Sequence, residues 1–184
     1  MRVTDAGLPG VLLIEPDVHR DPRGFFLETY HADKFRAIGI TVAFVQDNHS
    51  QSSLGTLRGL HLQTARPQAK LVRVIEGEIF DVAVDVRRGS PTFGKWCGSV
   101  LTAERLVECY IPAGFAHGFA VTSATAQVEY KCSDIYDATC EVGIAWDDPA
   151  LAIHWPIARP LLSDRDRRNP PLSGVLAGLP NFVP

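Results

Sequence analysis

The sequence predicts an all-β protein, a sandwich or barrel with only a few short peripheral helices. Runs of β-branched and aromatic residues alternate with polar residues at a period of two, which is the pattern of half-buried strands. Turn residues separate these runs along most of the chain, as in all-β sandwiches and barrels. Only residues 31–38, which Gly39 closes, and a turn at 148–152 have a helical pattern.

The predicted strands follow one another with short connections. They cover residues 11–15, 25–30, 42–50, 56–63, 70–76, 78–86, 95–101, 107–111, 117–121, 126–132 and 143–146. Gly77 stands between two strongly apolar runs, so we expect a tight hairpin turn there. A chain of 184 residues can bury one complete core, and no linker or repeat interrupts it. We expect a single domain over residues 1–184, with a tail from about residue 160 to 184 that wraps the barrel.

Composition excludes several classes of partner. A net charge of −3 provides no basic surface for nucleic acid. No apolar stretch approaches the roughly 20 residues of a membrane-spanning helix, and the short run at 11–14 does not fit a signal peptide. We therefore expect a cytoplasmic protein with no nucleic-acid or membrane partner. No C-x-x-C pair occurs, and we expect reduced thiols at Cys97, Cys109, Cys132 and Cys140.

Two stretches have the spacing of a known barrel motif. Five residues separate Gly55 from His61, and residues 112–117 read Pro-Ala-Gly-Phe-Ala-His. These stretches resemble the two sequence motifs of the cupin superfamily. The resemblance implies a double-stranded β-helix, which is a jelly-roll barrel, and metal-binding members of the superfamily supply three histidines and a glutamate.

The residues expected to hold a metal are changed. Gln63 stands where the second histidine belongs, and Lys70 stands where the glutamate belongs. A lysine repels a divalent cation, and two histidines fall short of the three protein ligands usual at catalytic sites. We therefore expect neither a metal nor another cofactor. If the strands alternate, cationic or basic side chains line one barrel interior and favour an anionic ligand, namely Arg58, His61, Lys70 and His117.

Four blocks in order carry a more specific resemblance: residues 21–28 (DPRGFFLE), 44–50 (FVQDNHS), 57–63 (LRGLHLQ) and 112–119 (PAGFAHGF). They resemble the successive signatures of dTDP-4-dehydrorhamnose 3,5-epimerases, and the similarity continues through 129–131, Tyr136, Glu141, 153–156 and 162–166. The resemblance covers nearly the whole chain. It implies an isomerase that epimerises dTDP-4-dehydro-6-deoxy-D-glucose at C3 and C5 to dTDP-4-dehydro-L-rhamnose, without a cofactor.

The resemblance also implies roles for individual residues. His61 is the general base, Asp166 orients it, and Tyr130 is the acid on the opposite face of the sugar, while Lys70 lies near the C4 oxygen. Arg23 and Arg58 hold the diphosphate, and Tyr136 lies beside the nucleotide. The rest of the pocket is formed by Glu28, Gln46, Asn48, His117, Glu141 and Arg165. In this family the segment with Arg23 and Glu28 crosses to a second subunit, which implies a homodimer.

These residue types suit the removal of a proton next to a ketone. C3 and C5 flank the C4 ketone, so loss of a proton from either gives an enolate. A histidine has an unperturbed pKa of about 6.5 and acts as a base at neutral pH, and a neighbouring aspartate fixes its tautomer. A lysine stabilises the enolate oxygen electrostatically.

The sequence leaves alternatives open. Relatives in deoxysugar antibiotic pathways epimerise C3 only or C5 only, and another relative shifts the ketone between C4 and C3. A non-catalytic cupin would bind a sugar nucleotide without exchanging its protons, and a metal-dependent cupin oxygenase would contain a transition metal. The sequence does not distinguish cell-wall rhamnose from a secondary metabolite as the pathway, nor does it give the oligomer size beyond a dimer or the role of the cysteines.

Overall fold

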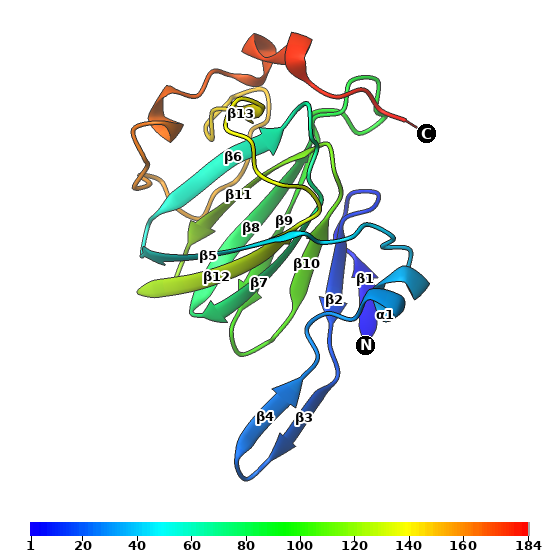
Figure 1. Ribbon diagram of the computed structural model, residues 1–184. Helices are drawn as coiled ribbons and strands as arrows, with labels where there is room; N and C mark the ends of the chain where they lie inside the picture. The colour runs from blue at the N-terminus through cyan, green and yellow to red at the C-terminus, as the bar shows by residue number, and fades with distance from the viewer. Residues whose placement is uncertain (184) are drawn as a thin grey trace.

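Two antiparallel β-sheets face each other in the computed structural model, which describes residues 1–183 (Figure 1). The six-stranded sheet has the order β1-β2-β10-β7-β12-β5, and the five-stranded sheet has the order β13-β6-β11-β8-β9. Most neighbours within a sheet are distant in sequence, because the chain passes repeatedly from one sheet to the other. This is the arrangement of a jelly roll, so the predicted all-β, cupin-like barrel is confirmed.

The six-stranded sheet consists of β1 (Arg2–Asp5), β2 (Leu12–Glu15), β5 (Gln46–Ser53), β7 (Lys70–Glu76), β10 (Glu108–Ile111) and β12 (Thr125–Cys132). The five-stranded sheet consists of β6 (Leu57–Gln63), β8 (Glu78–Asp85), β9 (Trp96–Thr102), β11 (Phe115–Val121) and β13 (Glu141–Gly143). A separate hairpin pairs β3 (Val18–Asp21) with β4 (Gly24–Leu27). The helices are α1 (Ala32–Ala37) and three short 3₁₀ helices, η1 (Asp166–Arg168), η2 (Leu172–Gly174) and η3 (Leu176–Gly178).

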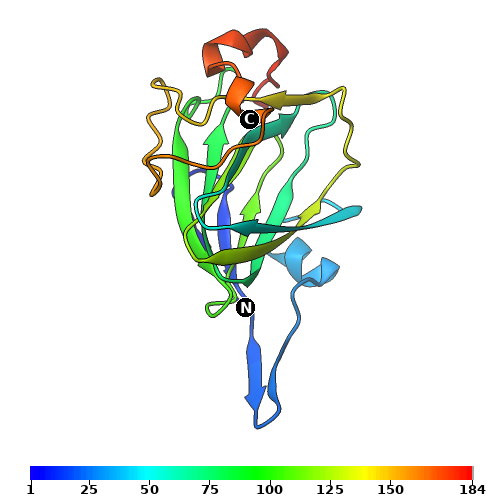
Figure 2. The same ribbon diagram turned by 90° about the vertical axis from the view of Figure 1, so that its left-hand side faces the viewer.

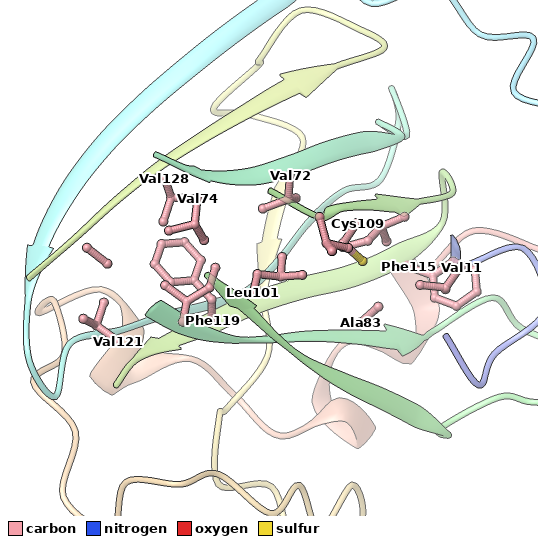
Figure 3. Packing of buried hydrophobic residues seen from close by; sticks show 14 of the residues in the cluster. Val11, Val72, Val74, Ala83, Leu101, Cys109, Phe115, Phe119, Val121 and Val128 are labelled. Atoms are coloured by element: carbon pink, nitrogen blue, oxygen red, sulfur yellow. The ribbon is translucent and has the colours of Figure 1, made fainter. Parts of the chain in front are cut away.

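Apolar side chains fill most of the space between the sheets. Val72 and Val74 of β7 pack with Leu101 of β9 and Phe119 of β11, and all four are buried (Figure 3). Successive side chains of a strand point to opposite faces, so each strand directs every second residue into this core. The core fixes the two sheets relative to each other and thereby positions the strands that carry the polar site.

The outer faces of both sheets are also covered. Ile144, Leu172 and Leu179, from the C-terminal third of the chain, pack with Val82 and Val84 of β8. β8 is therefore buried on both faces, which explains its nearly continuous apolar sequence. On the six-stranded sheet, α1 and the residues after it cover part of the outer face, and Figure 1 shows this helix beside β1 and β2.

The predicted hairpin at Gly77 is wrong. β7 and β8 belong to different sheets, so the chain turns a corner at Gly77 and does not pair the two strands. Gly77 has a φ of +76°, and a Cβ at this position would lie 2.0 Å from the carbonyl oxygen of Thr125. The close approach of another loop and the positive φ therefore require glycine here.

Several strand boundaries also differ from the prediction. The strand predicted at 42–50 begins only at Gln46. Val42 and Phe44 lie before it and are apolar because they pack on the outer face of the six-stranded sheet. The strand predicted at 143–146 is instead β13 at 141–143, and the next residue, Ile144, still exchanges two backbone hydrogen bonds with Leu60 of β6 before the chain turns away. β1 and β3 are short, mostly exposed strands whose polar sequences do not predict them.

The hairpin of β3 and β4 projects from the body of the molecule (Figures 1 and 2). Near its tip the side chains of Phe25 and Phe26 are 55% and 71% exposed. A two-stranded hairpin is at best marginally stable by itself in water. An exposed aromatic pair on such a ribbon is typical of a segment that contacts another surface.

A β-bulge in β6 places Arg58 and His61 on the same side of the sheet. His117 of β11 pairs with His61 and Phe119 pairs with Arg58, so a step of two residues on β11 matches a step of three on β6. Without the bulge, residues three apart would point to opposite faces. Gly59, within the bulge, has a φ of +114°, and a Cβ there would lie 2.6 Å from the β11 backbone. The site therefore depends on glycine at this position.

Glu108 of β10 is a buried carboxyl group outside the core. Its side chain is 2% exposed, and its Oε2 atom has no hydrogen-bond partner among residues 1–183. Burial raises the pKa of Glu108 to about 8, although the positive charges of Arg73 and Lys131 act in the opposite direction. Glu108 is therefore largely protonated in the folded chain at neutral pH.

We expect Glu108→Gln to remove a pH dependence of stability. The unfolded carboxyl group titrates at a pKa of about 4.3, so between there and about pH 8 the folded wild type holds a proton that the unfolded chain releases. The free energy of unfolding of the wild type should fall by a few kcal/mol as pH rises through this window, at about 1.4 kcal/mol per pH unit. In urea unfolding at about pH 5, 7 and 9, the free energy of unfolding of the variant minus that of the wild type should increase as the pH rises. A constant difference at all three values would contradict this.

Candidate active site

A cavity of about 530 Å³ opens between strands of both sheets and the C-terminal segment around residues 161–166. Its lining includes Arg58, His61, Lys70, His117, Tyr130, Arg165 and Asp166. A second cavity of about 290 Å³ adjoins it and adds Gln46, Asn48, Tyr136 and Glu141. Both cavities are lined by His61, Lys70 and Tyr130, so these residues lie where the two meet. The structure thus brings together all the predicted site residues except Arg23 and Glu28.

His61 and Asp166 form a hydrogen-bonded pair in this cleft. The Nε2 atom of His61, on β6, lies 2.6 Å from Oδ1 of Asp166, at the start of η1. Burial acts to raise the pKa of Asp166, but the hydrogen bond and charge of His61, together with hydrogen bonds from Ser163 and the backbone of Gly59, hold the pKa below its usual value. An ionised carboxylate only accepts hydrogen bonds, so Nε2 of His61 donates. The other ring nitrogen, Nδ1, is then unprotonated in the neutral imidazole.

Glu141 lies on the Nδ1 side of His61, with 4.0 Å between Oε1 and Nδ1. The hydroxyl of Tyr136 donates a hydrogen bond of 2.6 Å to Glu141, and the guanidinium of Arg165 forms an ion pair with the same carboxylate. Burial acts to raise the pKa of Glu141, but these two hydrogen bonds hold it below its ordinary value. The network joins β13, the preceding loop and the C-terminal segment at one end of the cleft.

Lys70 and Tyr130 lie side by side on the adjacent strands β7 and β12 of the six-stranded sheet. The Lys70 ammonium lies 5.8 Å from the centroid of the Tyr130 ring. Burial lowers the pKa of Lys70, although the negative charges of Glu141 and Asp81 favour its charged form. Burial also raises the pKa of Tyr130, so its phenol keeps its proton at neutral pH. The cleft therefore places a half-buried lysine beside a protonated phenol.

His117 forms the inner wall of the cleft. It is 6% exposed, and its Nε2 atom lies 2.7 Å from Oδ1 of Asp81 on the neighbouring strand β8. Burial lowers the pKa of His117, while the carboxylate of Asp81 acts to raise it. The histidine pairs directly with His61 in the β6–β11 ladder.

Arg58 lies at the rim of the larger cavity. Its Nε atom donates a 3.0 Å hydrogen bond to the hydroxyl of Ser52, and Nη2 donates a longer one of 3.4 Å to the carbonyl of Gln51. On the same strand as Ser52, the amide of Gln46 donates to Asn48 at 3.0 Å. Arg58 thus presents a positioned cation to the cavity mouth.

Arg23 and Glu28 lie outside both cavities. The Arg23 side chain, in the turn of the projecting hairpin, is 90% exposed and forms an ion pair of 2.5 Å with Asp21. Glu28 follows the hairpin and forms an ion pair of 2.8 Å with Lys34. Within one chain, these two predicted residues therefore do not join the site.

The sequence did not predict two further residues of the cleft. Ser50 lines the larger cavity, and its buried hydroxyl has no hydrogen-bond partner among the described residues. Cys132 lines the smaller one, and its sulfur accepts a hydrogen bond of 3.5 Å from Asn48. Ser50 is two positions from Asn48, and Cys132 is two positions from Tyr130. The period-two rule for strands could have indicated both.

Among residues 1–183, no group of three or more His, Cys, Asp or Glu side chains is placed to hold a metal ion. No helix in this part of the chain has both the length and the apolar character needed to cross a membrane.

The fold and the cleft define a cupin-type jelly-roll barrel with a histidine–aspartate pair, a half-buried lysine and a phenol arranged for general acid–base chemistry. The chain belongs to the dTDP-4-dehydrorhamnose 3,5-epimerase family, whose model matches residues 5–174. Relatives of that name from Pseudomonas aeruginosa and Neisseria gonorrhoeae are 53% identical over 170 residues and 52% identical over 167 residues.

These alignments differ in how much of each relative they cover. They cover 91% of this chain and 94% of the Pseudomonas relative, but 90% of this chain and 51% of the Neisseria relative. The chain thus spans about half the length of the Neisseria protein. Among solved structures, dTDP-6-deoxy-D-glucose-3,5-epimerase from Legionella pneumophila, in complex with dTDP-4-keto-L-rhamnose, is 45% identical with a TM-score of 0.97. That match covers 100% of this chain and 99% of the Legionella chain.

Proposed function

We propose that this protein epimerises dTDP-4-dehydro-6-deoxy-D-glucose at C3 and C5 through an enolate and forms dTDP-4-dehydro-L-rhamnose. The observation that carries the proposal is the position of His61. Its ring is hydrogen-bonded to Asp166 through one nitrogen and lines both parts of a cleft that Lys70 and Tyr130 also line. Family membership and the substrate-related ligand of the Legionella structure support the choice of substrate.

The first chemical step is removal of a proton from the carbon next to the ketone. Nδ1 of His61 takes this proton, the electron pair of the C–H bond forms a double bond to C4, and the π pair of the C4 carbonyl moves to its oxygen. The imidazolium that forms is stabilised by Asp166, which accepts the Nε2 hydrogen bond at 2.6 Å. A general base of this kind contributes about 10²- to 10⁴-fold in rate.

Lys70 then stabilises the negative charge on the C4 oxygen. The side chain is half-buried and partly desolvated, so a nearby anion replaces solvation that the lysine has lost. Tyr130 donates a proton to the carbon from the opposite face, which inverts the configuration. Its buried phenol is protonated at neutral pH and so is ready to donate.

The rest of the cleft suits a nucleoside diphosphate. Arg58 offers a guanidinium at the mouth of the larger cavity, and an arginine binds phosphate through paired hydrogen bonds. Tyr136 is an exposed ring next to Glu141 and Arg165 and lines the smaller cavity. We assign Gln46, Asn48 and His117 to substrate binding because they also line the two cavities.

We further propose that the active form is a homodimer. Arg23 and Glu28 lie away from the cleft of their own chain, on and beside a hairpin with two exposed aromatic residues. A second copy would receive this hairpin and gain a second arginine for the diphosphate. A cytoplasmic location stays a prediction from the sequence.

Proton exchange in deuterated water tests the proposed function. The protein is incubated with dTDP-4-dehydro-6-deoxy-D-glucose in D₂O, and NMR follows deuterium at each sugar carbon. We expect label at both C3 and C5, because each is acidified by the C4 ketone. Label at one carbon would identify a single-position epimerase, and bound nucleotide without label would identify a non-catalytic binding protein. Either result would contradict the proposal.

A further inference from the structure

Gln63 occupies the position at which a metal-binding cupin would have its second histidine, and here it has another contact. The residue ends β6 and is 5% exposed. Its Nε2 atom donates a 3.0 Å hydrogen bond to the carbonyl oxygen of Asp137, and its Oε1 atom accepts a 3.1 Å hydrogen bond from the Asp137 N–H. The carboxamide therefore satisfies both backbone groups of one loop residue.

Asp137 lies in the loop at 133–140, which connects β12 to β13 and carries Tyr136. Other side chains hold the same loop, since Gln68 donates to the carbonyl of Asp134 at 2.7 Å and Gln46 accepts from the backbone N–H of Tyr136 at 2.8 Å. Of the three glutamines, only Gln63 makes two hydrogen bonds to the backbone of a single loop residue. It thereby fixes both the distance and the orientation of the peptide next to Tyr136.

The loop carries Tyr136, which is part of a hydrogen-bond network at the cleft. The Tyr136 hydroxyl donates to Glu141 at 2.6 Å, and Glu141 also pairs with Arg165 and lies 4.0 Å from His61. A displaced Asp137 peptide would move Tyr136 and loosen this network, while leaving the His61–Asp166 pair on β6 and η1 in place. The two ends of the cleft are thus held by separate contacts.

We propose that Gln63 is a positioning residue that holds the loop at 133–140 so that Tyr136 is presented to the nucleotide. The proposal rests on the proposed function, since it assigns the nucleotide to this end of the cleft. Gln63 itself faces the loop backbone and transfers no proton. Its substitution should therefore weaken nucleotide binding and leave the chemical step nearly intact.

The test compares Gln63→Met and Gln63→Glu with a control, Gln51→Met, on the outward face of β5. Methionine removes both hydrogen bonds at similar volume, and glutamate keeps the shape but turns the donor into an acceptor facing the Asp137 carbonyl. For both variants we expect the Kd for dTDP and the KM to rise about 5- to 10-fold, the scale of one or two lost hydrogen bonds, with kcat changed less than about twofold. Hydrogen–deuterium exchange should be faster at 133–140 and unchanged in β6 and β12.

The outcomes separate the two proposals. If the wild type binds dTDP but exchanges no substrate protons, the proposed function fails and the dTDP and loop measurements still decide the role of Gln63. If the wild type is active and both variants keep wild-type affinity, the positioning role is wrong, whether or not the loop exchanges faster. A fall in kcat equal to the fall in kcat/KM would also overturn it, because the residue would then act on the chemical step. If Gln63→Met does not fold, Gln63→Glu decides.

Discussion

His61→Ala should remove hydrogen exchange at both C3 and C5 of the substrate. The imidazole is the base for both carbons in our mechanism, and its partner Asp166 has no other basic group to orient toward the sugar. We expect kcat to fall by about 10²- to 10⁴-fold, the usual contribution of a general base. The Kd for dTDP should change less than about threefold, because Arg58 and the network around Tyr136 remain. NMR in D₂O and calorimetric titration with dTDP measure the two effects.

His154→Ala is the matched control for this experiment. His154 is exposed, contacts Trp96 edge-on at 5.8 Å between ring centroids and lies outside both cavities. Its loss should leave exchange unchanged. Persistent exchange at either carbon in His61→Ala would show that another group removes that proton. Exchange retained at one carbon only would mean that the two positions use different bases.

Lys70→Met should reduce kcat by about 10²- to 10³-fold, which is the cost of removing one preorganised group from a developing oxyanion. Methionine fills the same space without charge, so the fold and dTDP affinity should be nearly unchanged. Burial lowers the pKa of Lys70, so wild-type kcat should decline with rising pH earlier than an ordinary lysine would allow. The variant should lack this decline. Steady-state kinetics from about pH 6 to pH 10 measures both predictions.

Lys95→Met provides the comparison for a lysine without a role in the cleft. Lys95 is exposed and borders neither cavity. A Lys70→Met enzyme with a raised KM and an unaltered kcat would show that the amine binds the ground state and does not stabilise the enolate. That result would remove Lys70 from the chemical step and leave the assignment of His61 intact.

Strand positions were predictable wherever burial produced an alternation of apolar and polar residues or a continuous apolar run. β6, β7, β8 and β12 fall within a residue of their predicted bounds because their side chains pack in the core. The prediction failed where an apolar sequence had another cause, as at Val42 and Phe44, which cover a sheet and are not in a strand. It also failed at Gly77, because a sequence does not reveal that a glycine is required by a distant loop.

The residues proposed to react were more predictable than the residues around them that line or position the site. The family blocks identified His61, Lys70 and Tyr130, and the structure places all three around one cleft. The role of Gln63 could not be predicted, because its partner Asp137 is 74 residues away in sequence and the contact is to backbone atoms. Ser50 was missed although it follows Asn48 at strand spacing, because a serine on a mostly polar strand has no distinctive signal.

The bulge in β6 has a consequence for redesign of this enzyme. It sets the spacing of Arg58 and His61 through the backbone, and the packing of Gly59 against β11 leaves no room to adjust it. In the proposed mechanism, this wall of the cleft therefore fixes the distance between the arginine that binds phosphate and the histidine that removes the proton. Engineers who want a new sugar accepted should leave this wall unchanged and vary Gln46 and Asn48 of β5 on the opposite sheet, while keeping Tyr130 of β12 as the proton donor.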